Sequence, residues 1–415
     1  MKNEKHIAEL TSRLRAKYGK PVDSVVSIAN LAEEVGTSEQ TMRRFLGKVK
    51  TKNGINPVSD KSLSVICRYV GYRDWSHFTQ SNGNGHELTD NDLLYIEHME
   101  PFFRNGKKYN LNYQQDTITV DMLNDYIKVI YATKQNIAHF YNLNHENNWA
   151  ADYVLAWMPN FNYFGQDWFR AILSQHAART DKPLVRLALT NFLRFGAFLT
   201  NDNVAYTPDS DTLNRAYAAY RKNNEYMPFQ EMRYYTNLLI DAKRNNETQK
   251  FNGLLHQFLQ EFEEQNIREF NKHEVMIFFS NTLIWMQEYA VAYELLKSRT
   301  KFITHFEENC ARERSLHYFG INMAFVKTTF ALTWVTNGLD ELPMFELSPT
   351  DFGHPNGLLY NDFIRLMYLA KCILTERGAK HKKKLYEELK TLADKTNYTR
   401  IYDVLKDFEE SPYQQ

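Results

Sequence analysis

The chain has 415 residues, 43% of them hydrophobic, and its 50 lysines and arginines are balanced by 50 aspartates and glutamates. This length predicts roughly two or three domains, and the hydrophobic content excludes a chain that is disordered throughout. No stretch approaches the roughly 18 consecutive apolar residues that a membrane-spanning helix needs, so we expect no membrane partner.

The cysteines and the first residues indicate a cellular compartment. Cys67, Cys310 and Cys372 are odd in number, lie far apart and form no Cys-x-x-Cys pair. Such usage is typical of a reducing environment. The opening sequence MKNEKHIAEL lacks the apolar core of a signal peptide. We therefore expect a cytoplasmic protein.

Residues 1–80 form the first predicted domain and carry an excess of positive charge. They hold 14 basic and 8 acidic side chains, a net charge of +6, which leaves 36 basic and 42 acidic side chains for the rest of the chain. A basic segment attached to an acidic body predicts an anionic partner for that segment.

Residues 31–45, LAEEVGTSEQTMRRF, predict two short helices joined by a turn. Ala32 is small enough for the second helix to cross the first closely, and Gly36 can adopt the positive φ that the turn requires. Thr37 and Gln40 have the spacing of a capping box at the start of the second helix.

A further helix is predicted in the sequence SDKSLSVICRYVG, where Ser59 or Asp60 can cap the start and Gly71 suits the left-handed conformation at the end. The apolar side chains expected to form the core around these helices are Leu31, Val35, Met42, Phe45, Leu63, Ile66, Tyr69, Val70, Trp75 and Phe78.

The combination of TMRRFLG with SLSVICRYVGYRDWSHF resembles the helix-turn-helix domain of the phage-repressor-like superfamily of bacterial regulators, over about residues 1–80. The resemblance implies that the second helix lies in the major groove of double-stranded DNA and reads base edges near its N-terminus. On this interpretation the outward face of that helix carries Glu39, Gln40, Arg43 and Arg44.

Basic residues continue after this helix. Arginine and glutamine can make paired hydrogen bonds to guanine and adenine, and lysines suit phosphate oxygens. Lys48, Lys50 and Lys52 are therefore predicted phosphate contacts. The alternative is that this basic stretch is only a solvated surface.

Residues 81–90, SNGNGHELTD, are the predicted linker, because no helix tolerates the sequence Asn-Gly-Asn-Gly well. Residues 91–415 then read as an all-α body with apolar residues at intervals of three and four. The stretches Val275–Leu296 and Tyr318–Val335 are apolar enough to be buried on more than one side.

The body is expected to consist of helical hairpins with turns near Tyr289, Gly338 and Gly378. The sequence EYAVAYELL resembles half of a tetratricopeptide repeat, which implies a solenoid-like stack of hairpins; an irregular helical bundle is the alternative.

The sequence contains no His-Glu-x-x-His pair, phosphate-binding loop or Gly-x-Ser-x-Gly elbow. We therefore predict no metal, cofactor or catalytic residues, and a protein that is not an enzyme. The hypothesis that follows is a bacterial DNA-binding transcriptional regulator, in which the helical-repeat body binds a peptide or protein effector or forms a homodimer. The alternative is a non-enzymatic helical scaffold that does not bind DNA.

Overall fold

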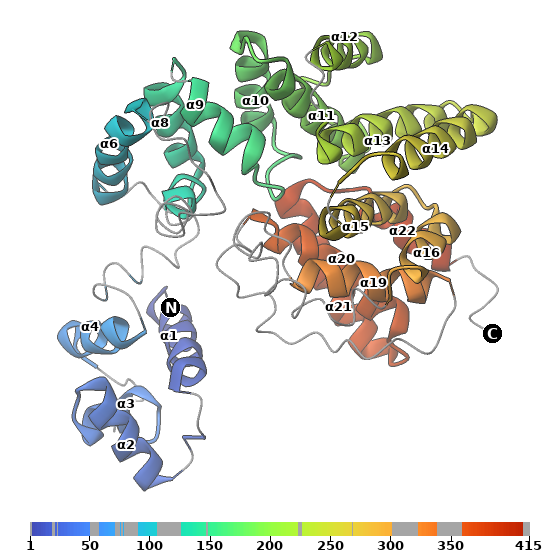
Figure 1. The fold of residues 1–415 in the computed structure, drawn as a ribbon. Helices are drawn as coiled ribbons and strands as arrows, with labels where there is room; N and C mark the ends of the chain where they lie inside the picture. Colours follow the sequence, from blue (N-terminus) through green and yellow to red (C-terminus); the bar gives the residue numbers. More distant parts are fainter. Residues whose placement is uncertain are drawn as a thin grey trace. The chain divides into compact units, whose positions relative to one another are not determined.

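The computed structural model describes residues 2–18, 21–22, 24–49, 58–70, 75, 78, 90–105, 126–146, 148–222, 226–267, 269–300, 323–337 and 359–409. Throughout these ranges the regular elements are helices and none is a strand, which confirms the predicted all-α class (Figure 1). The chain divides into two compact units, residues 1–91 and 92–415, which we call the head and the body. The predicted linker lies outside the described residues except for Asp90.

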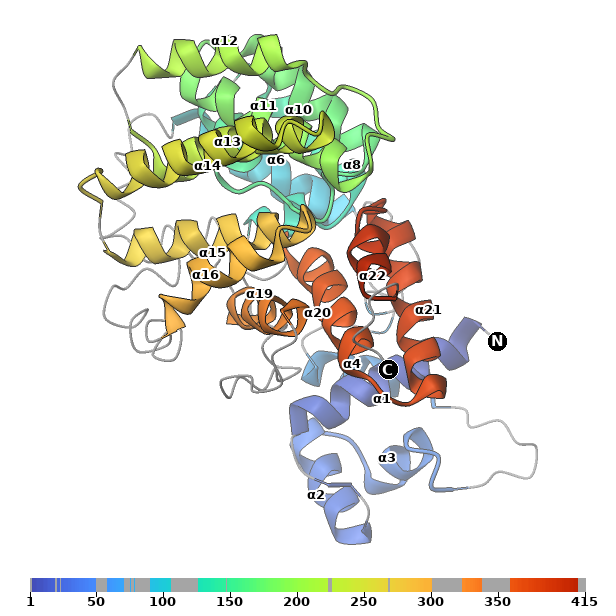
Figure 2. The same ribbon diagram turned by 90° about the vertical axis from the view of Figure 1, so that its right-hand side faces the viewer.

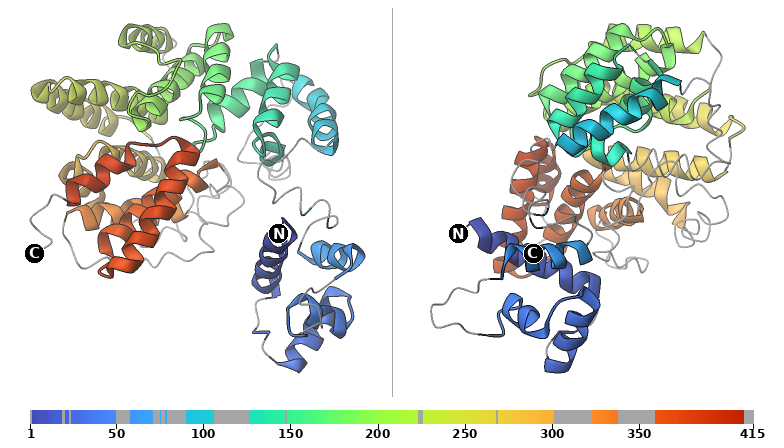
Figure 3. Two further views of the ribbon diagram at one scale, coloured as in Figure 1. Left: turned by 180° about the vertical axis from the view of Figure 1, so that it is seen from behind. Right: turned by 90° about the vertical axis from the view of Figure 1, so that its left-hand side faces the viewer.

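The head contains the helices α1 (Lys2–Tyr18), α2 (Val25–Val35), α3 (Glu39–Phe45) and α4 (Asp60–Tyr69) (Figure 3). Helix α2 packs against both α3 and α4, and α1 packs against α4. The core side chains predicted from the sequence are buried in this unit, except that Tyr69 and Val70 are only partly buried against it. Trp75 and Phe78 close the core with rings stacked 5.6 Å apart.

The turn between α2 and α3 has a specific backbone geometry. Gly36 has a φ of 76°, as predicted, and its N–H donates to Glu33 O at 3.0 Å. The Thr37 N–H donates to Ala32 O at 2.9 Å, so Thr37 completes the end of α2. Gly36 and Thr37 therefore both belong to the C-terminal signal of the first helix.

The predicted capping box of Thr37 and Gln40 is wrong. Helix α3 begins after Ser38, whose side-chain oxygen accepts the Thr41 N–H at 3.2 Å. Because the Thr37 N–H is engaged at the end of α2, the cap moves one residue along the chain. At α4, Ser59 is the N-cap rather than Asp60.

The body is built from consecutive helices (Figure 2). From the boundary onward they are α6 (Asp90–Asn105), α8 (Lys134–Asn144), α9 (Asn148–Asp152), the π-helix η2 (Tyr153–Trp157), α10 (Asp167–Arg179), α11 (Pro183–Leu199), α12 (Ser210–Arg221), α13 (Pro228–Arg244), α14 (Thr248–Glu263), α15 (Glu269–Trp285), α16 (Tyr289–Lys297), α19 (Met323–Thr336), α20 (Asn361–Thr375), α21 (Ala379–Thr396) and α22 (Ile401–Glu409).

Most of these helices pack against the next one along the chain, and α11, α13 and α15 also pack against one another in that order. Residues 275–286 of α15 and of the turn that follows it are buried on all sides, as their composition predicts. The turn expected near Tyr289 lies two residues earlier, at Gln287, which has a φ of 63°, while Tyr289 already begins α16. Gly378 precedes α21 as expected, and Gly338 lies outside the described residues.

The C-terminal helices of the body return to its earlier part, because the loop 158–166 is hydrogen-bonded to the start of α20. The Phe161 N–H donates to Leu359 O at 2.8 Å, and the Asp362 N–H donates to Asn162 Oδ1 at 2.9 Å. Trp285 of α15 stacks on Phe363 of α20 with ring centres 5.5 Å apart, and Phe161 of this loop contacts Phe192 of α11. With the packing of α11, α13 and α15, these contacts form a closed ring of elements.

Two further contacts fix the closure of the ring. The Tyr398 hydroxyl accepts the Phe164 N–H at 3.2 Å and donates to Phe161 O. A Cβ atom at Gly165 would lie 2.4 Å from Thr396 O, so only glycine allows this close approach of the two backbones.

Candidate functional site

The predicted DNA-contacting residues that the structure describes lie in α3 and in the residues directly after this helix. Met42 and Phe45 are buried beneath the outer surface of this helix. Gln40 and Lys48 are exposed, whereas Glu39, Arg43 and Arg44 are partly exposed. Lys50 and Lys52 lie outside the described residues.

One ion pair occupies this surface. Arg43 Nη1 lies 3.6 Å from Glu39 Oε1, and the two side chains are 39% and 42% exposed. An exposed pair one helical turn apart contributes only about 0.3–0.5 kcal/mol. Arg43 can therefore exchange Glu39 for another acceptor at little cost.

The end of α3 fixes the position of Lys48. Gly47 has a φ of 68°, its N–H donates to Arg44 O at 3.1 Å, and the Lys48 N–H donates to Arg43 O at 2.9 Å. This is the same glycine-based helix ending that terminates α2. This helix ending was not predicted from the sequence, although Gly47, the glycine after Phe45 and Leu46, was a signal for it.

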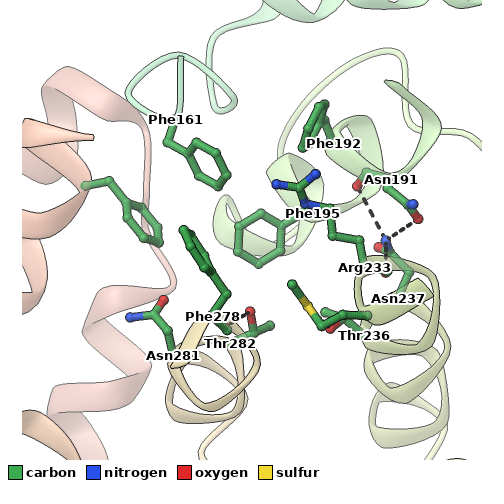
Figure 4. A pocket seen from close by; sticks show the side chains of 12 residues that line it. Phe161, Asn191, Phe192, Phe195, Arg233, Thr236, Asn237, Phe278, Asn281 and Thr282 are labelled. Carbon is green, nitrogen blue, oxygen red and sulfur yellow. Dashed lines mark hydrogen bonds between the residues drawn. The ribbon is translucent and has the colours of Figure 1, made fainter. Parts of the chain in front are cut away.

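A second candidate site is a cavity inside the closed ring of the body (Figure 4). The cavity has a volume of about 30 Å³. Its apolar wall consists of Phe161, Phe192, Phe195, Met232, Phe278 and Phe363. A cavity of this size has room for about two water molecules.

Among the described residues that line the cavity, Arg233 of α13 is the one with a charged side chain. Its guanidinium carbon lies 4.6 Å from the centre of the Phe192 ring and 5.8 Å from that of Phe229. Burial lowers the pKa of Arg233 to about 10, so the side chain stays charged at neutral pH. The other polar residues of the wall are Asn191, Thr236, Asn237, Asn281 and Thr282.

This cavity was not predicted from the sequence. Its walls come from helices that lie far apart in the sequence, and no local motif marks Arg233 or Asn191. The available signal was the high content of phenylalanine and tyrosine in the body, which predicts aromatic walls but not their meeting point.

A buried histidine and a buried aspartate, His176 and Asp152, form a hydrogen-bonded pair in the body. His176 Nε2 lies 2.8 Å from Asp152 Oδ1, and Lys182 Nζ lies 2.6 Å from Asp152 Oδ2. His176 is completely buried. Since no substrate can reach an inaccessible ring, this cluster serves to join the end of α9, helix α10 and the residue that precedes α11.

No protein-family model, curated protein or solved structure matches the chain. Across the described ranges, no cluster of three or more histidine, cysteine, aspartate or glutamate side chains is arranged to hold a metal ion. No helix in the same ranges has both the length and the apolar composition required to cross a membrane.

Proposed function

We propose that the protein is a DNA-binding transcriptional regulator whose head contacts double-stranded DNA through a helix-turn-helix formed by α2 and α3. The observation that supports this proposal best is the turn at Gly36, which holds α3 against α2 through Met42 and leaves Gln40, Arg43 and Lys48 on one outer surface. Neutral and cationic donors on one surface suit the acceptor-rich edges and phosphates of DNA.

The charges of the head agree with this role. Its net charge of +6 over residues 1–80 attracts an anionic polymer, and the rest of the chain carries a net charge of −6. Arg43 can give up its weak pair with Glu39 when a guanine edge or a phosphate is offered. Lys50 and Lys52 extend the basic stretch along the sequence.

A head with so few contacts needs a second head for useful affinity, so we propose that the regulator binds as a homodimer to half-sites about one helical turn apart. The helical-repeat body would supply the dimer contact or the binding of an effector. A stoichiometry of two chains per duplex in sedimentation experiments is the expected result, and one chain per duplex would contradict this part of the proposal.

The test begins with selection of a preferred duplex from a random library by the full-length protein. Gln40→Ala and Arg43→Ala should each weaken binding to that duplex by about 1–3 kcal/mol and reduce the preference over unrelated duplexes. Lys48→Ala should weaken binding to all duplexes alike and flatten the plot of log affinity against log salt by about 0.9.

Lys61→Ala is the matched control, because Lys61 is an exposed lysine of the head on a different helix, α4. It should leave the affinity and the salt slope unchanged. If the wild-type protein binds no duplex even at low salt, the basic stretch is a solvated surface. The hypothesis of a helical scaffold that does not bind DNA would then replace this one.

A further inference from the structure

A dense group of positive charges lies on the body, at the start of α21, which packs against α20 (Figure 2). Residues 377–384, RGAKHKKK, hold five basic side chains and no acidic one, although the chain beyond residue 80 carries a net charge of −6. We call this segment the basic patch. Its exposed basic residues are Arg377, Lys380, Lys383 and Lys384. A local excess of exposed positive charge on an acidic body attracts a negatively charged partner.

The stability of α21 does not explain these charges. The helix follows Gly378 and has neither an acidic residue in its first turn nor a side-chain cap. The first backbone N–H groups give this end of a helix a partial positive charge, so carboxylates stabilise it and cations weaken it. Lys380 and Lys382 therefore lie at the end of α21 that favours them least. A departure from a local stability rule is expected where a surface has a function.

One carboxylate lies next to the basic patch, and it is engaged in the turn before α21. Glu376 Oε1 accepts the Gly378 N–H at 2.6 Å, and Glu376 Oε2 lies 2.6 Å from His381 Nδ1. The hydrogen bond from Gly378, and after it the one to His381, hold the pKa of Glu376 below its ordinary value, so this group is charged at neutral pH. Glu376 offsets one of the five positive charges and leaves a net excess of four.

The spacing of the lysines favours a partner with regularly repeated charges. Lys380 lies three residues before Lys383 and four before Lys384, so these side chains share one face of α21. Side chains at this spacing on a helix have Cβ atoms about 5–6 Å apart. A row of cations on long flexible stems can contact successive phosphate groups of a nucleic-acid backbone.

The apolar side chains of α21 argue against a membrane as the partner. A helix that lies in a membrane surface inserts an apolar face into the lipid. In α21, Leu389 and Leu392 are buried, and Leu385 and Tyr386 are partly buried against the core of the body. The large apolar side chains of this helix are therefore already engaged within the protein.

The composition of the basic patch favours nucleic acid over an acidic protein. Protein interfaces are enriched in aromatic residues, methionine and arginine and are depleted in lysine. Four of the five basic residues of the patch are lysines. Exposed lysines suit phosphate oxygens, which supply affinity but carry no sequence information.

We propose that the basic patch is a second nucleic-acid-binding surface, which contacts the phosphate backbone of double-stranded DNA and does not read its sequence. The patch belongs to the body, so this proposal does not rest on the helix-turn-helix of the head.

The test compares full-length proteins in their binding to short DNA duplexes of unrelated sequence. The patch variant combines Lys380→Gln, Lys383→Gln and Lys384→Gln. Removal of three phosphate contacts, at about 0.9 each, should flatten the plot of log affinity against log salt by about 2–3. When salt rises from about 50 to about 200 mM, the wild type should therefore lose about 40-fold more affinity than the patch variant.

A matched control separates local charge from total charge. It combines Lys222→Gln, Lys250→Gln and Lys297→Gln, which remove the same charge from three other exposed lysines of the body, and it should keep the wild-type salt slope.

Two further measurements separate lost charge from lost structure. A variant with arginine in place of the three patch lysines keeps the charge and should also keep the wild-type salt slope. The patch variant should unfold at or above the wild-type temperature, because cations are removed from the positive end of α21.

A head variant with Arg43→Ala and Lys48→Ala distinguishes this proposal from the proposed function. The patch substitutions should weaken duplex binding by this variant as well, and for every duplex alike. If duplex binding is lost in the patch variant and kept in the head variant, the basic patch stands and the helix-turn-helix proposal fails.

The proposal is overturned if the patch variant keeps the wild-type affinity and salt slope, and loss of binding in the head variant would then leave the proposed function standing alone. It is also overturned if the wild type binds no duplex at low salt. A third contrary result is that the patch substitutions weaken binding to vesicles of anionic lipid and leave binding to DNA unchanged.

Discussion

Gly196 of α11 is the position at which a single methyl group should disturb the closed ring most. A Cβ atom there would lie 2.5 Å from Phe164 O and 2.5 Å from Arg170 Nη1. Neither neighbour can retreat freely, because Phe164 belongs to the closing loop and Arg170 Nη1 is held by Leu193 O at 2.7 Å. Gly196→Ala must therefore push the loop and the helix apart.

Opposing effects set the size of this change. Alanine favours the helix over glycine by about 1 kcal/mol. Overpacking costs about 1–3 kcal/mol, and loss of a hydrogen bond from the buried Arg170 costs about 1–3 kcal/mol more. The net expectation is a loss of about 1–5 kcal/mol in the free energy of unfolding of the body.

Gly253→Ala provides the matched control. Gly253 is an exposed glycine within α14, and a Cβ atom there meets nothing within 4 Å. The same substitution should stabilise the body by about 0.5–1 kcal/mol. Urea unfolding of both variants, followed by circular dichroism, measures the difference, and the reasoning is refuted if Gly196→Ala is as stable as the wild type or if the two variants shift in the same direction.

The remaining predictions concern a cap, a buried carboxyl group and the independence of the head. Ser38→Ala should reduce the stability of the head by about 1 kcal/mol, whereas Thr37→Ala should change it by less than about 0.5 kcal/mol; thermal melts compare them, and equal losses would contradict the cap at Ser38. The pKa of Glu274 is raised to about 8, so the native state holds a proton that the unfolded chain releases above its ordinary value near 4.5. Stability should then fall between these pH values by up to about 1.4 kcal/mol per pH unit, and Glu274→Gln should remove this slope in urea unfolding at about pH 5 and about pH 8. A fragment of residues 1–91 should show a cooperative helical melt, because that unit has its own buried core; an unfolded fragment would show that the head depends on the body.

The sequence was most informative where one short segment contains the whole cause of a structure. Gly36 shows the expected left-handed conformation because its neighbours in the chain determine that turn. Met42 and Phe45 are buried as their spacing predicts. The predicted cap is one residue too early because Thr37 and Ser38 are both suitable residue types, and only the hydrogen bond that Ser38 accepts from the Thr41 N–H identifies Ser38 as the cap.

The cavity could not be predicted because its residues meet only through the tertiary fold. The contacting rings of Phe161 and Tyr360 have centres 4.5 Å apart, although they are almost half the chain apart in sequence. The sequence places Arg233 on an amphipathic helix, α13, but not beside Phe192 of α11, whose ring lies 4.6 Å from its guanidinium carbon.

The closure of the ring also has a consequence for synthesis of the chain. The hydrogen bond from Asp362 to Asn162 joins residues 200 positions apart, and that from Phe164 to Tyr398 spans 234 positions. At about 5–20 residues per second, the ribosome needs about 10–45 s to make the intervening chain. During that interval the loop 158–166 lacks its C-terminal partners, and the ring of Phe161 has no Tyr360 or Phe363 to pack against. Correct closure of the ring therefore requires that the loop 158–166 of the nascent chain forms no stable alternative contacts before the C-terminal helices have been synthesised.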